Sequence, residues 1–347
     1  MKQQKRVSDY GIRIGEMECG KQNAITDVRG VKVGHVTLDD KEIKTGVTAI
    51  LPHGGNIFEE KVFGAVHVIN GFGKTLGTIQ IEELGTIETP ILLTNTLSVG
   101  TVAQGIVEYK LERNPNIGLA TGTVNPIVCE CNDGAYLNDI RGLHVQKEHV
   151  IQAINNADTT FFEGSVGAGT GMTCHKLKGG IGSASRIMNF DQTEYTIGTL
   201  ILSNHGQKKD LLMDGREIGK EICAIDENNV SETDKGSIII IIATDLPMTE
   251  RQLKRIAKRS VVGLMRTGSY MGQGSGELAI AFSTANRVNH YEEMKTIDLK
   301  MFNPNDMDIA FRAVAECVEE SILNSMVTAK TTIGRNGYEV KSLNEYL

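Results

Sequence analysis

The chain has 347 residues, 40% of them hydrophobic and 23% charged, so it can bury a sizeable core without disulfides or metals. Its formal net charge of -7 argues against a nucleic-acid partner, because phosphate binding needs a basic patch. There is no signal-peptide-like segment, no apolar run of membrane length and no disulfide-framework spacing among the six cysteines. We therefore expect a cytoplasmic protein with free thiols and no membrane partner.

The first part of the chain is patterned as short strands separated by turns. Strands are predicted at 31–36, 47–51 and 65–69, the last ending at Asn70-Gly71. Residues 96–110 carry apolar side chains at helical spacing, which predicts a helix. A buried strand is predicted at 195–202.

A polar segment then leads into the most apolar run of the chain. Residues 208–236 are charged and polar, and Asn228, Asn229, Ser231, Thr233 and Asp234 predict a loop at its end. Directly afterwards, Ser237 begins a run of isoleucines that is typical of a strand buried on both faces. A polar loop is thus predicted to meet a core strand at Gly236-Ser237.

The last third is predicted to contain two helices and one more strand. Thr249-x-x-Gln252 is a capping box that begins a helix whose basic residues lie mostly off its apolar stripe. A buried strand is predicted at 278–284, and Asp306 is predicted to cap a long final helix. Strands and helices mix without strict alternation, which favours an α+β fold with sheet packed on sheet and helices outside.

The glycine-rich segments do not match nucleotide-binding motifs. Gly73-Lys74-Thr75 lacks the P-loop glycine five residues earlier, where Val68 stands. The glycines around Ser275 precede a predicted strand, whereas a dinucleotide-binding loop opens a helix. The G-x-S-x-G nucleophile elbow is also absent. We expect no cofactor.

No metal site is predicted either. The eight histidines contain no H-x-x-x-H pair. Cys129-Glu130-Cys131 and Cys174-His175 are isolated, and a metal site there needs ligands from elsewhere in the chain that the sequence does not identify.

Gly236-Ser237 has the groups needed for self-cleavage. Glycine adopts backbone angles that other residues cannot, which lets the Gly236 carbonyl tilt toward the Ser237 hydroxyl. Attack by that hydroxyl gives an ester that water hydrolyses, leaving Ser237 with a free α-amine. Such an amine has an unperturbed pKa of about 7.7–8.0, so it can accept the hydroxyl proton near neutral pH. Most Gly-Ser steps before a strand are simple turns, so the dipeptide alone does not identify an enzyme.

A series of short motifs extends along almost the whole chain: NAITD (23–27), GVKVGH (30–35), TGVT (45–48), TNT (94–96), DGAYLND (133–139), GAGTG (167–171), GS (236–237) with its isoleucine run, ATD (243–245), RTG (266–268) and GSGE (274–277). With these motifs the chain resembles the L-aminopeptidase/D-esterase (DmpA-type) family, which includes the β-peptidyl aminopeptidases.

The resemblance implies a four-layer αββα sandwich, similar in layout to the N-terminal-nucleophile hydrolases but differently connected. It implies one domain, 1–347, that cleaves itself into an α chain, 1–236, and a β chain, 237–347. The two chains are expected to stay together non-covalently and to assemble as a homotetramer of αβ units. The implied function is removal of N-terminal residues from short peptides, amides or esters.

The resemblance also implies roles for individual residues. Ser237 is the expected nucleophile, and Ser275 and Glu277 are expected to orient it and relay its proton. Asn204 is the expected oxyanion donor, and Tyr136 is expected to line the site and donate to the tetrahedral oxygen.

Lys74 departs from the family pattern, because relatives usually carry an acidic residue there, which can help to hold a substrate ammonium group. Two alternatives stay open. One is acyl transfer of the ornithine acetyltransferase type, although that nucleophile is threonine. The other is an unprocessed, non-enzymatic small-molecule-binding protein.

Overall fold

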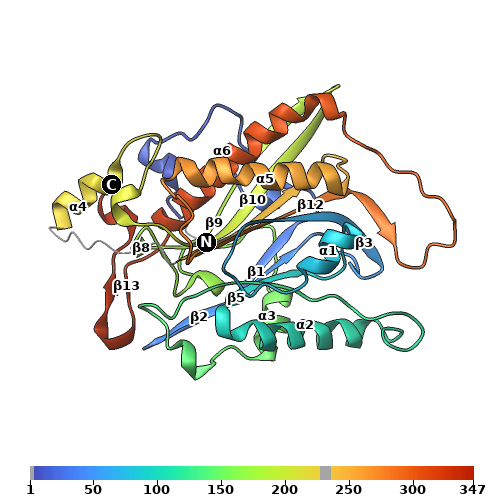
Figure 1. Cartoon of the computed structure of the whole chain (residues 1–347), viewed down its shortest axis with the longest axis horizontal. Helices are drawn as coiled ribbons and strands as arrows, with labels where there is room; N and C mark the ends of the chain where they lie inside the picture. The colour runs from blue at the N-terminus through green and yellow to red at the C-terminus, as the bar shows by residue number, and fades with distance from the viewer. Residues whose placement is uncertain (1–3, 227–235) are drawn as a thin grey trace.

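Two β-sheets form the middle of the molecule, and helices cover the outer face of each (Figure 1). The computed structural model describes residues 4–226 and 236–347. The polar loop predicted at 228–234 lies outside these residues. The order of layers is helix, sheet, sheet, helix, which is the αββα sandwich that the resemblance implies.

The larger sheet has the strand order β4-β3-β12-β11-β10-β9. Its central pair, β11 and β12, is parallel, and all its other neighbouring strands are antiparallel. Every residue of β11 is buried, as its isoleucine run predicts. The six strands are β3 (Glu60–Gly71), β4 (Thr86–Ile87), β9 (Gly180–Phe190), β10 (Thr193–Asn204), β11 (Ser237–Thr244) and β12 (Gly276–Asn289).

The smaller sheet has the order β1-β2-β5-β6. Its strands are β1 (Lys32–Asp40), β2 (Ile43–Leu51), β5 (Ile91–Asn95) and β6 (Ile127–Cys131). The helices α2 (Val99–Arg113) and α3 (Lys147–Asn155) cover its outer face, while α5 (Glu250–Arg266) and α6 (Met307–Val327) cover the larger sheet (Figure 1). The shorter elements are α1 (Thr78–Leu84), α4 (Ile218–Asp226) and the hairpins β7 (Thr173–Cys174) with β8 (Leu177–Lys178) and β13 (Thr332–Ile333) with β14 (Glu339–Val340).

Three apolar clusters fill the three interfaces between the four layers. Alternate residues of a strand point to opposite faces, so Ile238 packs in the cluster under α5 and α6, whereas Ile239 packs between the sheets. On the smaller sheet, Leu93 faces the sheet interface and Leu92 faces α2 and α3.

The predicted elements are present, and most of them are longer than the sequence patterns indicate. The strand predicted at 195–202 lies within β10, and the predicted helix at 96–110 contains a 3-10 turn, Thr96–Ser98, before α2. The capping box is formed, because Thr249 and Gln252 exchange hydrogen bonds of 3.2 and 3.4 Å. Asp306 stands before α6, but its side chain makes no capping hydrogen bond, because a 3-10 turn over Pro304–Asp306 precedes the helix.

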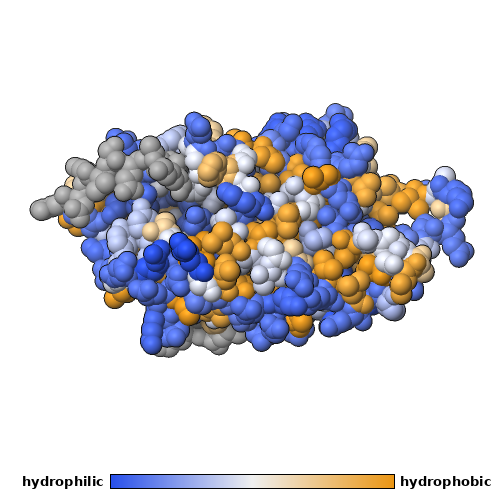
Figure 2. Space-filling view, turned by 60° about the horizontal axis from the view of Figure 1, so that its bottom comes forward, coloured by the Kyte–Doolittle hydropathy of each residue, from blue (hydrophilic) through white to orange (hydrophobic). Residues whose placement is uncertain are grey.

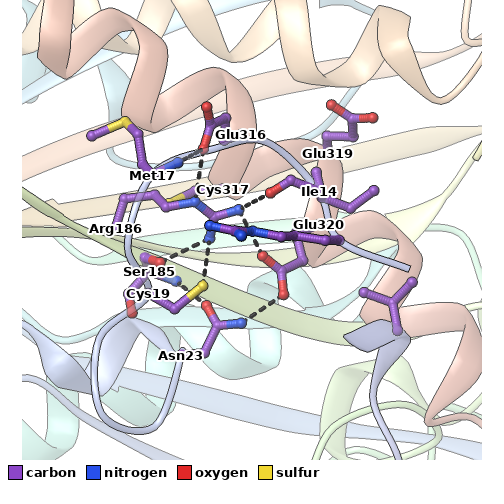
Figure 3. A network of polar contacts seen from close by, with 12 residues as sticks. Ile14, Met17, Cys19, Asn23, Ser185, Arg186, Glu316, Cys317, Glu319 and Glu320 are labelled. Atoms are coloured by element: carbon purple, nitrogen blue, oxygen red, sulfur yellow. Dashed lines mark hydrogen bonds and ion pairs between the residues drawn. The ribbon is translucent and has the colours of Figure 1, made fainter. Parts of the chain in front are cut away.

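A buried ion network ties the larger sheet to α6 and to the N-terminal segment (Figure 3). Arg186 of β9 is fully buried and lies 3.0 Å from Glu316 and 2.8 Å from Glu320 of α6. Its guanidinium also donates to the Ile14 carbonyl at 2.6 Å. Burial raises the pKa of Glu316, but hydrogen bonds from Arg186 and from two backbone amides outweigh it and lower that pKa below its ordinary value.

The surface mixes apolar and hydrophilic groups, with several apolar patches separated by hydrophilic side chains on the face shown in Figure 2. In the part of the chain that the structure describes, no helix has the length and apolarity needed to cross a membrane. All six cysteines are free thiols.

Candidate active site

Ser237 is the first residue of β11 and lies between two neighbouring strands. Its partner on β10 is Asn204, and its partner on β12 is Gly276. Residues directly opposite each other on antiparallel strands share one face of the sheet, with Cβ atoms about 5 Å apart. Ser237 and Asn204 therefore share the face toward the smaller sheet, since each is two residues from a side chain that packs there. Both are 6% exposed.

The Gly236 backbone is held close to both neighbouring strands. Its carbonyl accepts a hydrogen bond from the Gly276 amide at 3.1 Å. A Cβ at position 236 would lie 2.3 Å from the Asn204 carbonyl oxygen, a distance that no real Cβ tolerates. The close approach of the β10 backbone is therefore one reason for glycine here, and the unusual backbone angles expected from the sequence stay a prediction.

Ser275 and Glu277 flank Gly276 at the start of β12, and both are fully buried. The preceding loop is fixed by Asn70, whose amide donates to the Ser275 carbonyl at 2.5 Å and to the Gly272 carbonyl at 2.9 Å. The Ser275 hydroxyl has no hydrogen-bond partner among the described residues. Because β12 pairs with β11, the fold brings the backbone of this segment beside Ser237, although about 40 residues separate them in the sequence.

The Asn204 side chain is oriented by two hydrogen bonds. Its Oδ1 accepts from the Thr173 amide at 2.9 Å, and its Nδ2 donates to the Asn132 carbonyl at 3.0 Å. A carboxamide has two N–H donors, so one remains for an oxyanion formed at Ser237. The oxyanion role expected for Asn204 stays a prediction.

Tyr136 lies in the loop after β6 and is half-buried. Its hydroxyl accepts a hydrogen bond from Lys176 at 3.2 Å, and its ring stacks on Tyr338 with centroids 4.8 Å apart. Lys176 belongs to the β7–β8 hairpin, which also carries Thr173. Tyr136 is therefore linked to the Asn204 side of the site through this hairpin.

The structure adds Cys131, which sequence reasoning did not place in the site. It ends β6, on the opposite sheet, where its thiol donates to the Leu202 carbonyl at 3.6 Å and lies near the Ser237 hydroxyl. Burial raises the pKa of Cys131 well above its ordinary value, and the nearby Glu130 and Glu277 carboxylates raise it further. The group beside Ser237 is therefore a neutral thiol. Cys129-Glu130-Cys131 at the end of a strand was the available signal, but nothing local shows that it faces residue 237.

Glu130 is a second residue that the structure adds. Its carboxylate is only 4% exposed and accepts hydrogen bonds from the Lys74 amide at 2.8 Å and from the Thr96 hydroxyl. The Lys74 ammonium group instead lies over the Phe72 ring, 4.6 Å from its centroid. A carboxylate is therefore present beside residue 74, even though residue 74 is itself basic.

Comparison with known proteins agrees with this geometry. The family model described as peptidase family S58 matches residues 23–340. The chain belongs to peptidase family S58. It is 37% identical to the β-peptidyl aminopeptidase BapA of Sphingosinicella microcystinivorans, over 97% of this chain and 89% of that protein.

Solved structures of similar chains have the same fold. A protein of Pyrococcus horikoshii OT3 is 52% identical, with a TM-score of 0.93 over 99% of this chain and 97% of that one. The L-aminopeptidase D-Ala-esterase/amidase of Ochrobactrum anthropi, described as a variant of the Ntn hydrolase fold, is 35% identical. Its TM-score is 0.89, over 97% of this chain and 95% of that one.

These findings confirm the family and the fold class expected from the sequence motifs. They also confirm that the chain is a hydrolase of peptide bonds. Acyl transfer and a non-enzymatic binding role are not favoured.

Proposed function

We propose that the chain cleaves its own Gly236–Ser237 bond and then acts as an N-terminal-serine aminopeptidase and amidase on short peptides, amides or esters. The observation that carries the proposal is the position of Ser237. Its hydroxyl follows a carbonyl that already accepts a hydrogen bond from Gly276, and it stands opposite the oriented amide of Asn204.

Self-cleavage starts with attack of the Ser237 hydroxyl on the Gly236 carbonyl carbon. The Gly276 amide, 3.1 Å from the carbonyl oxygen, donates to that oxygen as negative charge develops on it. The carbon–nitrogen bond then breaks, and the nitrogen takes up a proton to become the free α-amine of Ser237. Water hydrolyses the resulting ester, which yields the Gly236 carboxylate and restores the hydroxyl.

Substrate hydrolysis repeats this chemistry with an external carbonyl. The α-amine of Ser237 takes the hydroxyl proton, as its pKa of about 7.7–8.0 in unperturbed form permits. The remaining N–H of Asn204 donates to the oxyanion. Ser275 and Glu277, buried on the adjacent strand, hold the new ammonium group and relay its proton to the leaving amine. Water then releases the acyl group.

An aminopeptidase must also recognise the free amine of its substrate. Glu130 is the residue we propose for this task, because it is a buried carboxylate that accepts a hydrogen bond from the amide of Lys74, the position at which relatives usually carry an acidic residue. The names of two relatives support substrates with a free N-terminal amine. One is a β-peptidyl aminopeptidase, and the other is an L-aminopeptidase D-Ala-esterase/amidase.

Intact mass spectrometry and denaturing gels test self-cleavage. The wild type is expected to give fragments 1–236 and 237–347, and Ser237→Ala a single inactive chain. Ser260→Ala is the matched control, because that buried hydroxyl lies on α5 and donates to the Ala257 carbonyl. A wild type that hydrolyses aminoacyl p-nitroanilides while remaining one chain would contradict the proposal. A cytoplasmic location and a homotetramer of αβ units without nucleic acid remain predictions, which cell fractionation and light scattering test.

A further inference from the structure

Three side chains with metal-ligating atoms meet behind the candidate active site. Cys174 and His175 come from the β7–β8 hairpin, and His205 follows the last residue of β10. The cysteine sulfur and one ring nitrogen of each histidine lie within 4.8 Å of one another. The sulfur is 3.9 Å from Nδ1 of His205. From the sequence alone Cys174-His175 was isolated, and the fold supplies its missing partner.

The cluster is buried, which is unusual for two histidines without a role. Cys174 and His175 are fully buried, and His205 is 2% exposed. The two rings pack edge to face with centroids 5.3 Å apart. Nε2 of His205 is buried and has no hydrogen-bond partner among the described residues. A buried polar atom without a partner is unfavourable, so this nitrogen is suited to a ligand.

The orientation of the His175 ring suits metal binding. Nδ1 of His175 donates to the Gln207 carbonyl at 2.9 Å, which leaves the lone pair on its Nε2. Metal-ligating histidines typically make such a bond, because it sets the tautomer and the ring orientation.

The backbone also holds His175 in place. His175 and Lys176 have φ of 49° and 60°, the left-handed region that a tight hairpin turn requires and that is usually taken by Asn-Gly. The His175 amide donates to the His205 carbonyl at 2.6 Å, which joins the two segments. A Cβ at Gly206 would lie 2.6 Å from the His175 ring, so the ring packs directly on that glycine.

We propose that Cys174, His175 and His205 bind one thiophilic divalent cation of the zinc class. One sulfur and two imidazole nitrogens suit Zn²⁺ or Co²⁺, whereas Mg²⁺ and Ca²⁺ prefer oxygen ligands. Zinc–sulfur and zinc–nitrogen bonds of about 2.3 and 2.0–2.1 Å place tetrahedral ligand atoms about 3.5 Å apart, so small side-chain rotations close the site. A water molecule or small anion takes the fourth position.

The bound ion would fix the position of Asn204 in the candidate active site. This consequence rests on the proposed function. Thr173, next to Cys174, donates to Asn204, and Asn204 is next to His205. Binding of the cation therefore changes the position of Asn204, the proposed oxyanion donor. We expect cation binding to alter kcat more than KM. Binding itself does not depend on self-cleavage, so Ser237→Ala should bind the ion as well as the wild type does.

Titration of reduced, metal-free protein tests the site. Calorimetry and native mass spectrometry should show one Zn²⁺ per chain with a rise in Tm, and Mg²⁺ should have no effect. Cys174→Ser and His205→Ala should weaken Zn²⁺ binding by about 10–100-fold or more, since each removes a ligand. Cys317→Ser, a buried thiol on α6, and His67→Gln, on β3, are the matched controls and should bind normally.

Cobalt spectroscopy of the wild type gives a readout that requires no variant to fold. Bound Co²⁺ should show a thiolate-to-metal charge-transfer band in the near ultraviolet and the intense visible bands of a tetrahedral site. The absence of the thiolate band, or equal Zn²⁺ affinity in wild type and Cys174→Ser, overturns the proposal. Loss of metal binding in Ser237→Ala would place the ion at the candidate active site instead and would also overturn it.

Discussion

Ser237 stands directly opposite Asn204 across the antiparallel pair of β11 and β10, and both side chains face the smaller sheet. Strand register alone sets this relationship. A hydroxyl and an oriented carboxamide so placed can act on the same carbonyl group, one as nucleophile and the other as donor to its oxygen.

Replacement of the oxyanion donor should slow hydrolysis strongly. Asn204→Ala is expected to lower kcat by about 10²–10³-fold, because one preorganised donor to the oxyanion is lost. KM for an aminoacyl p-nitroanilide should change little. Asn189→Ala, at an exposed position of β9, is the control. A large rise in KM with unchanged kcat would assign Asn204 to substrate binding instead.

A side chain at residue 236 should block self-cleavage. In Gly236→Ala the new methyl group would lie 2.3 Å from the Asn204 carbonyl oxygen, so the scissile bond must move away from Gly276. We expect the purified variant to remain mostly one chain on a denaturing gel after long incubation. Gly54→Ala should process normally, because no atom lies within 4 Å of a Cβ there. Complete and rapid processing of Gly236→Ala would contradict this role of the close approach.

Glu277→Gln should show whether the negative charge of Glu277, rather than the size of its side chain, is needed for hydrolysis. The amide keeps the size of the buried carboxylate but can neither stabilise the Ser237 ammonium group nor relay its proton. We expect kcat to fall by about 10²-fold or more and the acidic limb of its pH profile to shift. Glu83→Gln, on the exposed side of α1, should match the wild type. An unchanged pH profile would leave Glu277 with a packing role only.

Arg186→Met should destabilise the fold by about 3–5 kcal/mol, because it removes the buried cation that Glu316 and Glu320 share, although Glu316 keeps its ion pair with Arg312. Chemical denaturation measures this difference. Lys220→Met removes an exposed pair with Glu217 and should cost no more than about 1 kcal/mol. Equal effects of the two substitutions would show that the buried network contributes no more than a surface pair.

His35 should make the protein less stable in acid. Burial lowers the pKa of its ring from 6.5 to about 4, although a hydrogen bond with the Phe162 backbone opposes this. Between these values the unfolded chain binds a proton that the folded chain does not, so stability falls as the pH falls from 6.5 toward 4. The slope from this one group is at most about 1.4 kcal/mol per pH unit. Urea unfolding of His35→Gln should show a shallower decline than that of the wild type, and an equally steep decline in the two proteins would contradict this role of His35.

Much of the fold follows from local patterns. The isoleucine run after Ser237 requires burial on both faces, and the capping box at Thr249 starts a helix regardless of its neighbours. Gly236-Ser237 contains the groups for self-cleavage in two adjacent residues, so that hypothesis needed no tertiary information. The family motifs, ordered along the chain, then led to Asn204, Ser275 and Glu277.

Other features depend on which strands pair and which sheets stack. Cys131 lies beside Ser237 only because the two sheets pack face to face, and His205 reaches Cys174 only because the β7–β8 hairpin folds back on the end of β10. The need for glycine at 236 likewise arises from the backbone of a neighbouring strand. Residue patterns encode burial and periodicity over a few turns or one strand. Contacts between distant segments are decided by the packing of the whole chain, and these contacts define the environment of the nucleophile.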